Sequence, residues 1–219
     1  MRVAVLSDLH GNWPALAAVE RDLPDVDALL CAGDVVGYNP WPARCLEWLR
    51  KRSVPTVMGN HDRVVVRGSN FRGNPMARAG VTHARTCLDD DQVAWLADRP
   101  TALDAADGAI RVVHGHPDDP DRYTYPEEFG PDLLGEESVL VLGHTHVQHH
   151  EHTDEGVVLN PGSVGQPRDG DPRAAYATVD LETLSVTEHR VAYDVDRVAD
   201  GVREAELPAR TAERLREGR

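Results

Sequence analysis

Lysine is almost absent from this chain of 219 residues: Lys51 is the only one, and arginine supplies the other basic side chains. The 23 basic and 37 acidic residues give a formal net charge of −14. Such a chain lacks the basic surface that displaces counterions from nucleic acid, so we expect no duplex nucleic-acid partner. Abundant carboxylates favour a protein kept soluble by strong hydration at high salt, and an ordinary acidic cytosolic protein is the alternative.

Cysteine and long apolar runs are also scarce. Cys31, Cys45 and Cys87 are odd in number and lack metal-ligand spacing, so we expect reduced core thiols in a reducing compartment. No apolar run approaches the length of a membrane span, and residues 1–7 lack the basic start of a signal peptide. These absences predict a cytoplasmic protein with no membrane partner.

Internal repeats, low-complexity tracts and obvious linkers are missing too, so the length predicts a single domain over residues 1–219. Up to residue 146, strand patterns alternate with helical patterns, which indicates βαβ units and a largely parallel sheet. After it, short strands joined by turns suggest antiparallel pairing in a second sheet packed on the first. The tail from Asp194 is expected to be a helix on the flank, with a contact in a homo-oligomer as the alternative.

The apolar patterns place the elements as follows. Strands are expected at Arg2–Ser7, Asp27–Cys31, Val54–Met58, Ile110–Val113, Ser138–Leu142, Val147–Thr153, Gly156–Leu159, Ala174–Asp180 and Leu184–Val191. Helices are expected from Pro14 and at Trp41–Arg52, Met76–Cys87 and Asp89–Asp98, with loops at Gly68–Asn74 and Asp118–Gly135.

The stretch from Gly59 to Asp62 has the strongest chemical character. It follows the expected strand Val54–Met58, and open α/β sheets bind their ligands where such strands end. Asn60 offers a carbonyl oxygen, and His61 offers an imidazole that titrates near neutrality. A ligand beside an acid–base group suits metal-assisted chemistry better than packing.

Four other strand ends carry ligand-type side chains: Asp8 and His10, Asp34, His114, and His144 and His146. Residues two apart in a strand face one side, so each of the two pairs would place two ligands together if extended geometry persisted. Taken alone, Asp8 or Asp34 is typical of a cap or turn, and His114 of a rim histidine. The ordered set instead favours a metal site.

The number and chemistry of these side chains favour two metals. Mixed Asp, His and Asn ligation suits Mn²⁺, Fe²⁺, Zn²⁺ and Ni²⁺. Seven side chains are too many for one tetrahedral site and fit two ions that share a carboxylate, roughly 3.5–4 Å apart.

The ordered motifs resemble those of the calcineurin-like metallophosphoesterase superfamily: Asp8-x-His10, Gly33-Asp34, Gly59-Asn60-His61-Asp62, His114-Gly115 and Gly143-His144-x-His146. The segment Asn160–Ser163 extends the resemblance to the small single-domain phosphodiesterase branch. The resemblance implies an α/β fold, a four-layer αββα sandwich of two mixed β-sheets flanked by helices. It assigns Asp8, His10 and His146 to a first metal, Asp34 as the bridge, and Asn60, His114 and His144 to a second. His61 would bind no metal and would protonate or stabilise the leaving oxygen.

The implied function is a dinuclear metal-dependent phosphoesterase acting on small phosphate esters. Small-molecule or nucleotide phosphodiesters are the first choice of substrate, cleaved by a hydroxide that bridges the metals. Mn²⁺ is the first choice of metal, with Ni²⁺, Zn²⁺ and Fe²⁺ as alternatives. A phosphomonoesterase or nucleotide pyrophosphatase with the same site is the first rival. A non-catalytic metal-binding scaffold, similar to the retromer scaffold subunit, is the second, and the presence of His61 argues against it.

One departure from the superfamily affects the choice of substrate. Its protein phosphatases follow Gly-Asp with an Asp-Arg pair, whereas here Val35 and Val36 follow Asp34. The departure argues against a phosphoprotein substrate and leaves the partner of His61 open.

Three further residues have two interpretations each. Asp62 is expected to orient His61 or to cap the next helix. Asn12 is expected to contact phosphate or to cap the first helix. Arg168 is expected to clamp an anion or to lie in a solvated loop.

Overall fold

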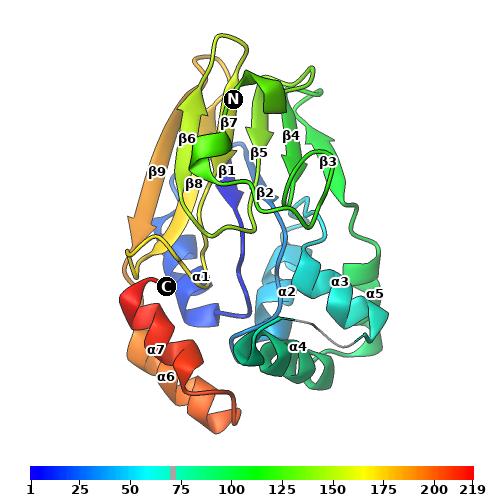
Figure 1. Cartoon of the computed structure of the whole chain (residues 1–219), viewed down its shortest axis with the longest axis vertical. Helices are drawn as coiled ribbons and strands as arrows, with labels where there is room; N and C mark the ends of the chain where they lie inside the picture. Colours follow the sequence, from blue (N-terminus) through cyan, green and yellow to red (C-terminus); the bar gives the residue numbers. More distant parts are fainter. Residues whose placement is uncertain (70–72) are drawn as a thin grey trace.

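Short runs of valine, leucine and alanine form two mixed β-sheets in the computed structural model, which describes residues 1–69 and 73–219 (Figure 1). The four-stranded sheet has the order β2-β1-β8-β9, and the five-stranded sheet the order β3-β4-β5-β7-β6. The strands are β1 Arg2–Leu6, β2 Ala28–Cys31, β3 Ala102–Ala105, β4 Ile110–Val113, β5 Val139–Val141, β6 His149–His152, β7 Val157–Asn160, β8 Ala174–Asp180 and β9 Ser185–Val191.

The two sheets pack face to face through alternate side chains of their strands. Val3 and Val5 of β1 meet Ile110 and Val112 of β4 in one buried cluster, together with Val139, Val141, Leu159, Ala177 and Val179. Side chains two apart in a strand share a face, so this period of two is what builds the layer between the sheets.

Helices occupy the lower part of the view in Figure 1, and the sheets the upper part. The helices are α1 Trp13–Asp22, α2 Pro42–Lys51, α3 Asn60–Arg67, α4 Pro75–Cys87, α5 Asp90–Ala97, α6 Val195–Glu204 and α7 Arg210–Glu217. Leucines of α1 and α2 pack with Leu6 and Tyr176 of the four-stranded sheet, whereas α6 and α7 share a smaller core around Val202 and Leu215. Among the described residues, every helix is too short or too polar to cross a lipid bilayer.

The outer face of the five-stranded sheet is covered in a different way. Leu140, Leu142 and Val158 pack there against Phe129, Leu133 and Leu134. These covering residues belong to the loop that contains the 3-10 turns η1 Pro126–Glu128 and η2 Pro131–Leu133.

Several sequence predictions agree closely with the observed elements. Ile110–Val113 and Ala174–Asp180 have the predicted bounds, and Asp194 caps α6 by accepting a hydrogen bond from the backbone N–H of Arg197. The expected arrangement of two mixed sheets flanked by helices is confirmed. Of the predicted loop at 68–74, residues 70–72 lie outside the described residues.

Other predictions were wrong. Val54–Met58 forms only one bridge, from Thr56 to Cys31, because Pro55 has no N–H to donate to a sheet ladder. Strands β8 and β9 join the first sheet, where β8 runs antiparallel to β1, and β7 runs parallel to β5. An alternating pattern marks a strand without naming its partner. All three cysteines are free thiols, and Cys87 is exposed rather than in the core.

The strand directions bring the polar strand ends together. Strands β1 and β2 are parallel in one sheet, and β4, β5 and β7 are parallel in the other. The carboxyl ends of parallel strands open at one edge of a sheet, where ligands bind in open α/β folds. Asp8, Asp34, His114 and His144 follow these strand ends directly or within three residues.

Candidate metal centre

The polar residues after the strands adopt an unusual backbone conformation. Five of them have a positive φ: Asp8 53°, His10 46°, Asp34 51°, His144 67° and His146 62°. This left-handed region is uncommon for residues other than glycine and is concentrated at functional sites. The extended backbone geometry that would place Asp8 with His10, and His144 with His146, on one side of a strand therefore does not persist beyond the strand ends.

Backbone hydrogen bonds between neighbouring loops hold this conformation. The N–H of Asp8 donates to the carbonyl of Gly33, and the N–H of His10 donates to that of Asp34, both at 2.9 Å. The loops after β1 and β2 thereby hold each other, and these hydrogen bonds keep Asp8, His10 and Asp34 in their left-handed backbone conformation.

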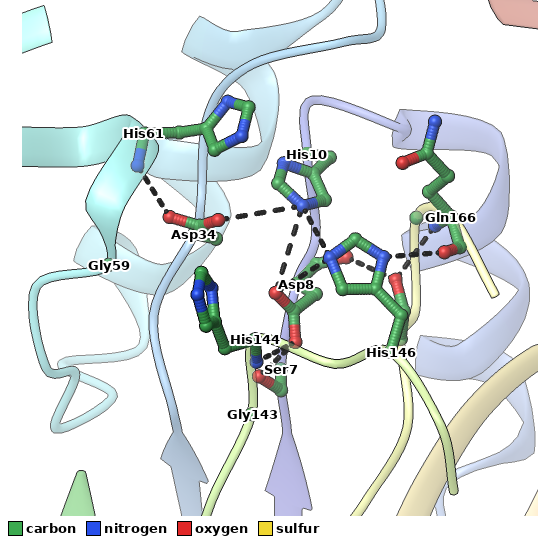
Figure 2. Close-up of polar contacts among 12 residues, drawn as sticks. Ser7, Asp8, His10, Asp34, Gly59, His61, Gly143, His144, His146 and Gln166 are labelled. Atoms are coloured by element: carbon green, nitrogen blue, oxygen red, sulfur yellow. Dashed lines mark hydrogen bonds and ion pairs between the residues drawn. The ribbon is translucent and has the colours of Figure 1, made fainter. Parts of the chain in front are cut away.

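One group of three potential ligands consists of Asp8, His10 and His146, all buried, with ligand atoms within 4.8 Å of one another. Nε2 of His146 lies 3.2 Å from Oδ1 of Asp8. Nε2 of His10 lies 3.7 Å from the same oxygen and 3.1 Å from Nε2 of His146. Figure 2 shows these three side chains converging.

A second group consists of Asp34, His114 and His144. Oδ2 of Asp34 lies 3.5 Å from Nε2 of His114 and 3.6 Å from Nε2 of His10 in the first group. Oδ1 of Asn60 lies 3.2 Å from Nε2 of His114. All seven expected ligands therefore gather in one place, with Asp34 between the two groups.

The ring nitrogens of the first group fit a cation. Nδ1 of His10 donates to the carbonyl of Val36 at 3.0 Å, and Nδ1 of His146 donates to that of Gln166 at 2.6 Å. Burial lowers the pKa of both rings, so each is neutral and has its single N–H on Nδ1. The two Nε2 lone pairs then face each other at 3.1 Å, an arrangement that repels unless a cation lies between them.

The carboxylates meet the same requirement. Oδ1 of Asp8 is buried and accepts no hydrogen bond from any residue that the structure describes. Burial by itself would raise the pKa of Asp34, but the imidazoles of His114 and His61 hold it well below its usual range. Both aspartates are therefore ionised at neutral pH and can serve as ligands to a divalent ion.

His114 differs from the other rings in the metal-free protein. Its Nδ1 donates to the carbonyl of Ala32 at 2.7 Å. Burial would lower its pKa, but the charge of Asp34 and the hydrogen bond to it raise the pKa to about 9. The ring is an imidazolium at neutral pH, and that proton must leave before Nε2 can bind a metal.

His61 lies beside the first group at the start of α3. Its backbone N–H donates to Oδ1 of Asp34 at 2.8 Å, and its ring centroid lies 4.8 Å from that of His10 (Figure 2). Burial lowers its pKa to about 4. His61, His10 and Asp34 also satisfy the geometric criterion for a ligand group, so geometry alone leaves open whether His61 touches a metal.

Asp62 caps the helix and ties it to a neighbouring loop. Its carboxylate accepts from the backbone N–H groups of Gly59 at 3.1 Å, Val35 at 3.3 Å and Val36 at 3.1 Å. Because its hydrogen bonds go to these backbone groups, the capping interpretation of Asp62 holds.

Asn12 likewise takes the capping role. Its Oδ1 accepts from the N–H of Ala15 at 3.2 Å, and its Nδ2 donates to the carbonyl of Gly165 at 2.9 Å. Because the side chain has no exposed surface, we assign Asn12 as the N-cap of α1 rather than as a residue that contacts a substrate directly.

Arg168 lies in a pocket rather than in a solvated loop. The pocket has a volume of about 190 Å³ and is lined by Arg168, His61 and Asp34, with Tyr38, Asn60, Gly73, Asn74, Ala77, Tyr123, His144 and His146. The guanidinium donates to the hydroxyl of Tyr38 at 3.1 Å and to Oε1 of Gln166 at 2.8 Å.

Sequence reasoning missed five of the lining residues, and two of these, Tyr38 and Tyr123, are aromatic. Tyr38 follows the Gly33-Asp34 motif at a positive φ of 52°, and Tyr123 lies in the loop after β4. Proximity to Asp34 was the signal available for Tyr38. Tyr123 had no local signal, because its neighbour His144 lies 21 residues away in the chain.

Comparisons with known proteins agree with this geometry. The family model of the calcineurin-like phosphoesterase superfamily domain matches residues 1–184. A metallophosphoesterase crystal structure from Sphaerobacter thermophilus is 33% identical, covers 100% of this chain and 99% of its own, and superposes with a TM-score of 0.85.

Two sequence relatives extend these matches. An uncharacterised protein of Methanocaldococcus jannaschii is 29% identical over 239 residues, covering 99% of this chain and 98% of its own. The phosphodiesterase YfcE of Escherichia coli is 29% identical over 201 residues, covering 85% of this chain and 91% of its own.

Proposed function

The chain belongs to the calcineurin-like phosphoesterase superfamily, and from that premise we propose that it is a dinuclear metal-dependent phosphodiesterase acting on small-molecule or nucleotide esters. The position of Asp34 carries the proposal. Its Oδ2 lies 3.6 Å from Nε2 of His10 and 3.5 Å from Nε2 of His114, between the two ligand groups. A carboxylate between two ligand groups fits a pair of metals held roughly 3.5–4 Å apart, as in hydrolytic two-metal sites.

The two groups would each hold one divalent ion. The first would lie among Asp8, His10 and His146, and the second among Asn60, His114 and His144, with Asp34 bridging them. When bound, such ions lower the pKa of water and neutralise the oxygens of a phosphoryl group. We take Mn²⁺ as the first choice, since the site mixes carboxylate, amide and imidazole ligands.

In this proposal His61 acts on the leaving oxygen. It lines the pocket at the start of α3 and is almost fully buried. Its low pKa leaves the ring neutral in the empty pocket, and an anionic ester next to it favours the protonated form. The ring can then donate a proton or a hydrogen bond to an otherwise poor alkoxide leaving group.

In this proposal Arg168 binds a phosphoryl oxygen. Its two hydrogen-bond acceptors are the neutral groups of Tyr38 and Gln166, and its Nε is buried with no partner in the described part of the chain. Among residues 1–69 and 73–219 no carboxylate pairs with this guanidinium, so its positive charge is available to an anion.

Similarity to a named phosphodiesterase favours a diester over a monoester as the substrate. The E. coli protein called a phosphodiesterase matches 85% of this chain. The chain also lacks the Asp-Arg pair of the superfamily's protein phosphatases, since Val35 and Val36 follow Asp34.

A metal-dependent activity screen tests the proposal. Protein stripped with a chelator is reloaded with Mn²⁺, Ni²⁺, Zn²⁺ or Fe²⁺ and given bis-p-nitrophenyl phosphate, p-nitrophenyl phosphate and a dinucleotide. We expect metal-dependent cleavage with kcat/KM highest for the diesters, and two bound ions per chain by elemental analysis. Asp34→Asn should bind fewer ions and lose turnover. If p-nitrophenyl phosphate were strongly preferred, the protein would be a phosphomonoesterase rather than a phosphodiesterase. Inactivity with every metal would favour a non-catalytic scaffold.

A further inference from the structure

Two exposed tyrosines lie side by side at the mouth of the candidate site. Tyr123 is 45% exposed and Tyr125 is 43% exposed, and Met1 is the one other large hydrophobic residue so exposed in the described part of the chain. The tyrosine rings are nearly parallel, at 14°, with centroids 6.1 Å apart. Single exposed aromatic residues are ordinary, but a stacked pair beside a catalytic pocket suggests a binding surface.

The pair is connected directly to the metal ligands. The ring of Tyr123 stacks on that of His144 with centroids 3.8 Å apart and planes at 23°. His144 Nε2 donates to the carbonyl of Asp121, in the same loop, at 3.2 Å. A row of three rings therefore runs outward from the second ligand group, through Tyr123 to Tyr125.

Hydrogen bonds anchor the loop that carries both rings. Thr124 between them is buried, and its hydroxyl donates to the carbonyl of Gly115 at 3.2 Å. The N–H of Tyr125 donates to Oε1 of Glu128 at 3.0 Å. Thr124 is buried whereas Tyr123 and Tyr125 are exposed, so the backbone between the two rings is already ordered before a ligand binds.

The pocket is small, so we expect part of a diester substrate to lie outside it. About 190 Å³, shared with metal ions, accommodates a phosphoryl group and little more. Tyr123 belongs to the wall of this pocket, and Tyr125 lies beyond it. An ester group that left the pocket on the side of His144 would meet the ring of Tyr123 first, because that ring stacks on His144.

We propose that Tyr123 and Tyr125 form a stacking platform for a flat aromatic or heterocyclic group of the substrate, such as a nucleobase; this inference rests on the proposed phosphoesterase function. Every nucleobase has a π-face, so a platform of this kind selects for a flat ring without selecting one base. It narrows the substrate class from small phosphodiesters to those that carry an aromatic or nucleoside group.

The test measures binding rather than turnover. Adenosine 5′-monophosphate and glycerol 3-phosphate present the same phosphate with and without a flat ring, and calorimetry on the Mn²⁺-loaded full chain gives both dissociation constants. We expect the nucleotide to bind about tenfold more tightly, the usual effect of stacking one base on an aromatic side chain. Tyr125→Ala should remove that preference and Tyr125→Phe should keep it.

Glu127→Ala is the matched control, because Glu127 is exposed in the same loop and carries no ring. It should keep the preference of the wild-type protein. Equal binding of the two compounds by the wild type, or an unchanged preference in Tyr125→Ala, would overturn the platform and leave the phosphate site intact. Failure of both compounds to bind would overturn the proposed function together with the platform.

Discussion

The carboxylate of Asp62 accepts a hydrogen bond from the backbone N–H of Val36 at 3.1 Å, across 26 residues of sequence. A second bond, from the N–H of Val35, comes from the same turn. That turn begins with Asp34, whose Oδ1 in return accepts from the N–H of His61 at 2.8 Å. The proposed bridging ligand and the proposed general acid are therefore held by one reciprocal set of hydrogen bonds.

Replacing Asp62 with asparagine should destabilise the protein. Burial, and next the charge of Asp34, raises the pKa of Asp62 to about 7, and three backbone N–H groups rely on its oxygens. Asparagine would present an NH₂ group to one of these donors, at a cost of about 1–3 kcal/mol. Urea unfolding measures the loss. Asp154→Asn, at an exposed residue, should change little, and equal effects would contradict this account.

Replacing Gly37 with alanine should displace the His61 ring. Gly37 has a φ of 99°, and a Cβ there would overlap Nδ1 of His61. A displacement of about 1 Å in an acid–base group lowers kcat by about a hundredfold. Metal content should stay the same by elemental analysis. Gly108 has a φ of 89° and open space around it, so Gly108→Ala imposes a similar backbone strain and should leave kcat unchanged.

His61→Ala should keep both metals and lose activity. We expect the largest loss, about 10²–10⁴-fold in kcat, on alkyl esters, whose leaving oxygen needs a proton. A p-nitrophenyl ester should lose less, because p-nitrophenolate leaves without one. His152→Ala, at an exposed position of β6, is the control. Loss of one metal in His61→Ala would instead make His61 a ligand with His10 and Asp34.

Metal affinity should rise with pH up to about pH 9. In the metal-free protein the pKa of His114 is raised from 6.5 to about 9, so the ring holds a proton between these values that the unfolded chain does not hold. The stabilisation from this proton is present below pH 6.5 and is lost as the pH rises through 9. A metal ion must displace the same proton, so binding at pH 7.5 should release about one proton.

Calorimetry of Mn²⁺ binding in buffers of different ionisation enthalpy measures that release. The released fraction should decline toward zero above pH 9, where His114 is already neutral. Binding without proton release at pH 7.5 would show that His114 carries no displaceable proton.

Part of the fold follows from local patterns. Short apolar runs gave the bounds of β4 and β8. They gave no partner for β8, which crosses back to pair with β1. The apolar residues of Val54–Met58 match the pattern of a strand. Pro55 has no backbone N–H to donate to a sheet ladder, and the segment forms only one bridge.

The sequence alone indicated the seven ligand-type residues, because they follow strand ends in a fixed order along the chain, but it did not indicate Tyr38 or Tyr123. The tertiary structure alone decided what each residue touches. Asp62 meets Val36 across 26 residues, Arg168 meets Tyr38 across 130, and Tyr123 stacks on His144. Such contacts depend on how loops from different strands pack against each other, and no local pattern encodes that packing.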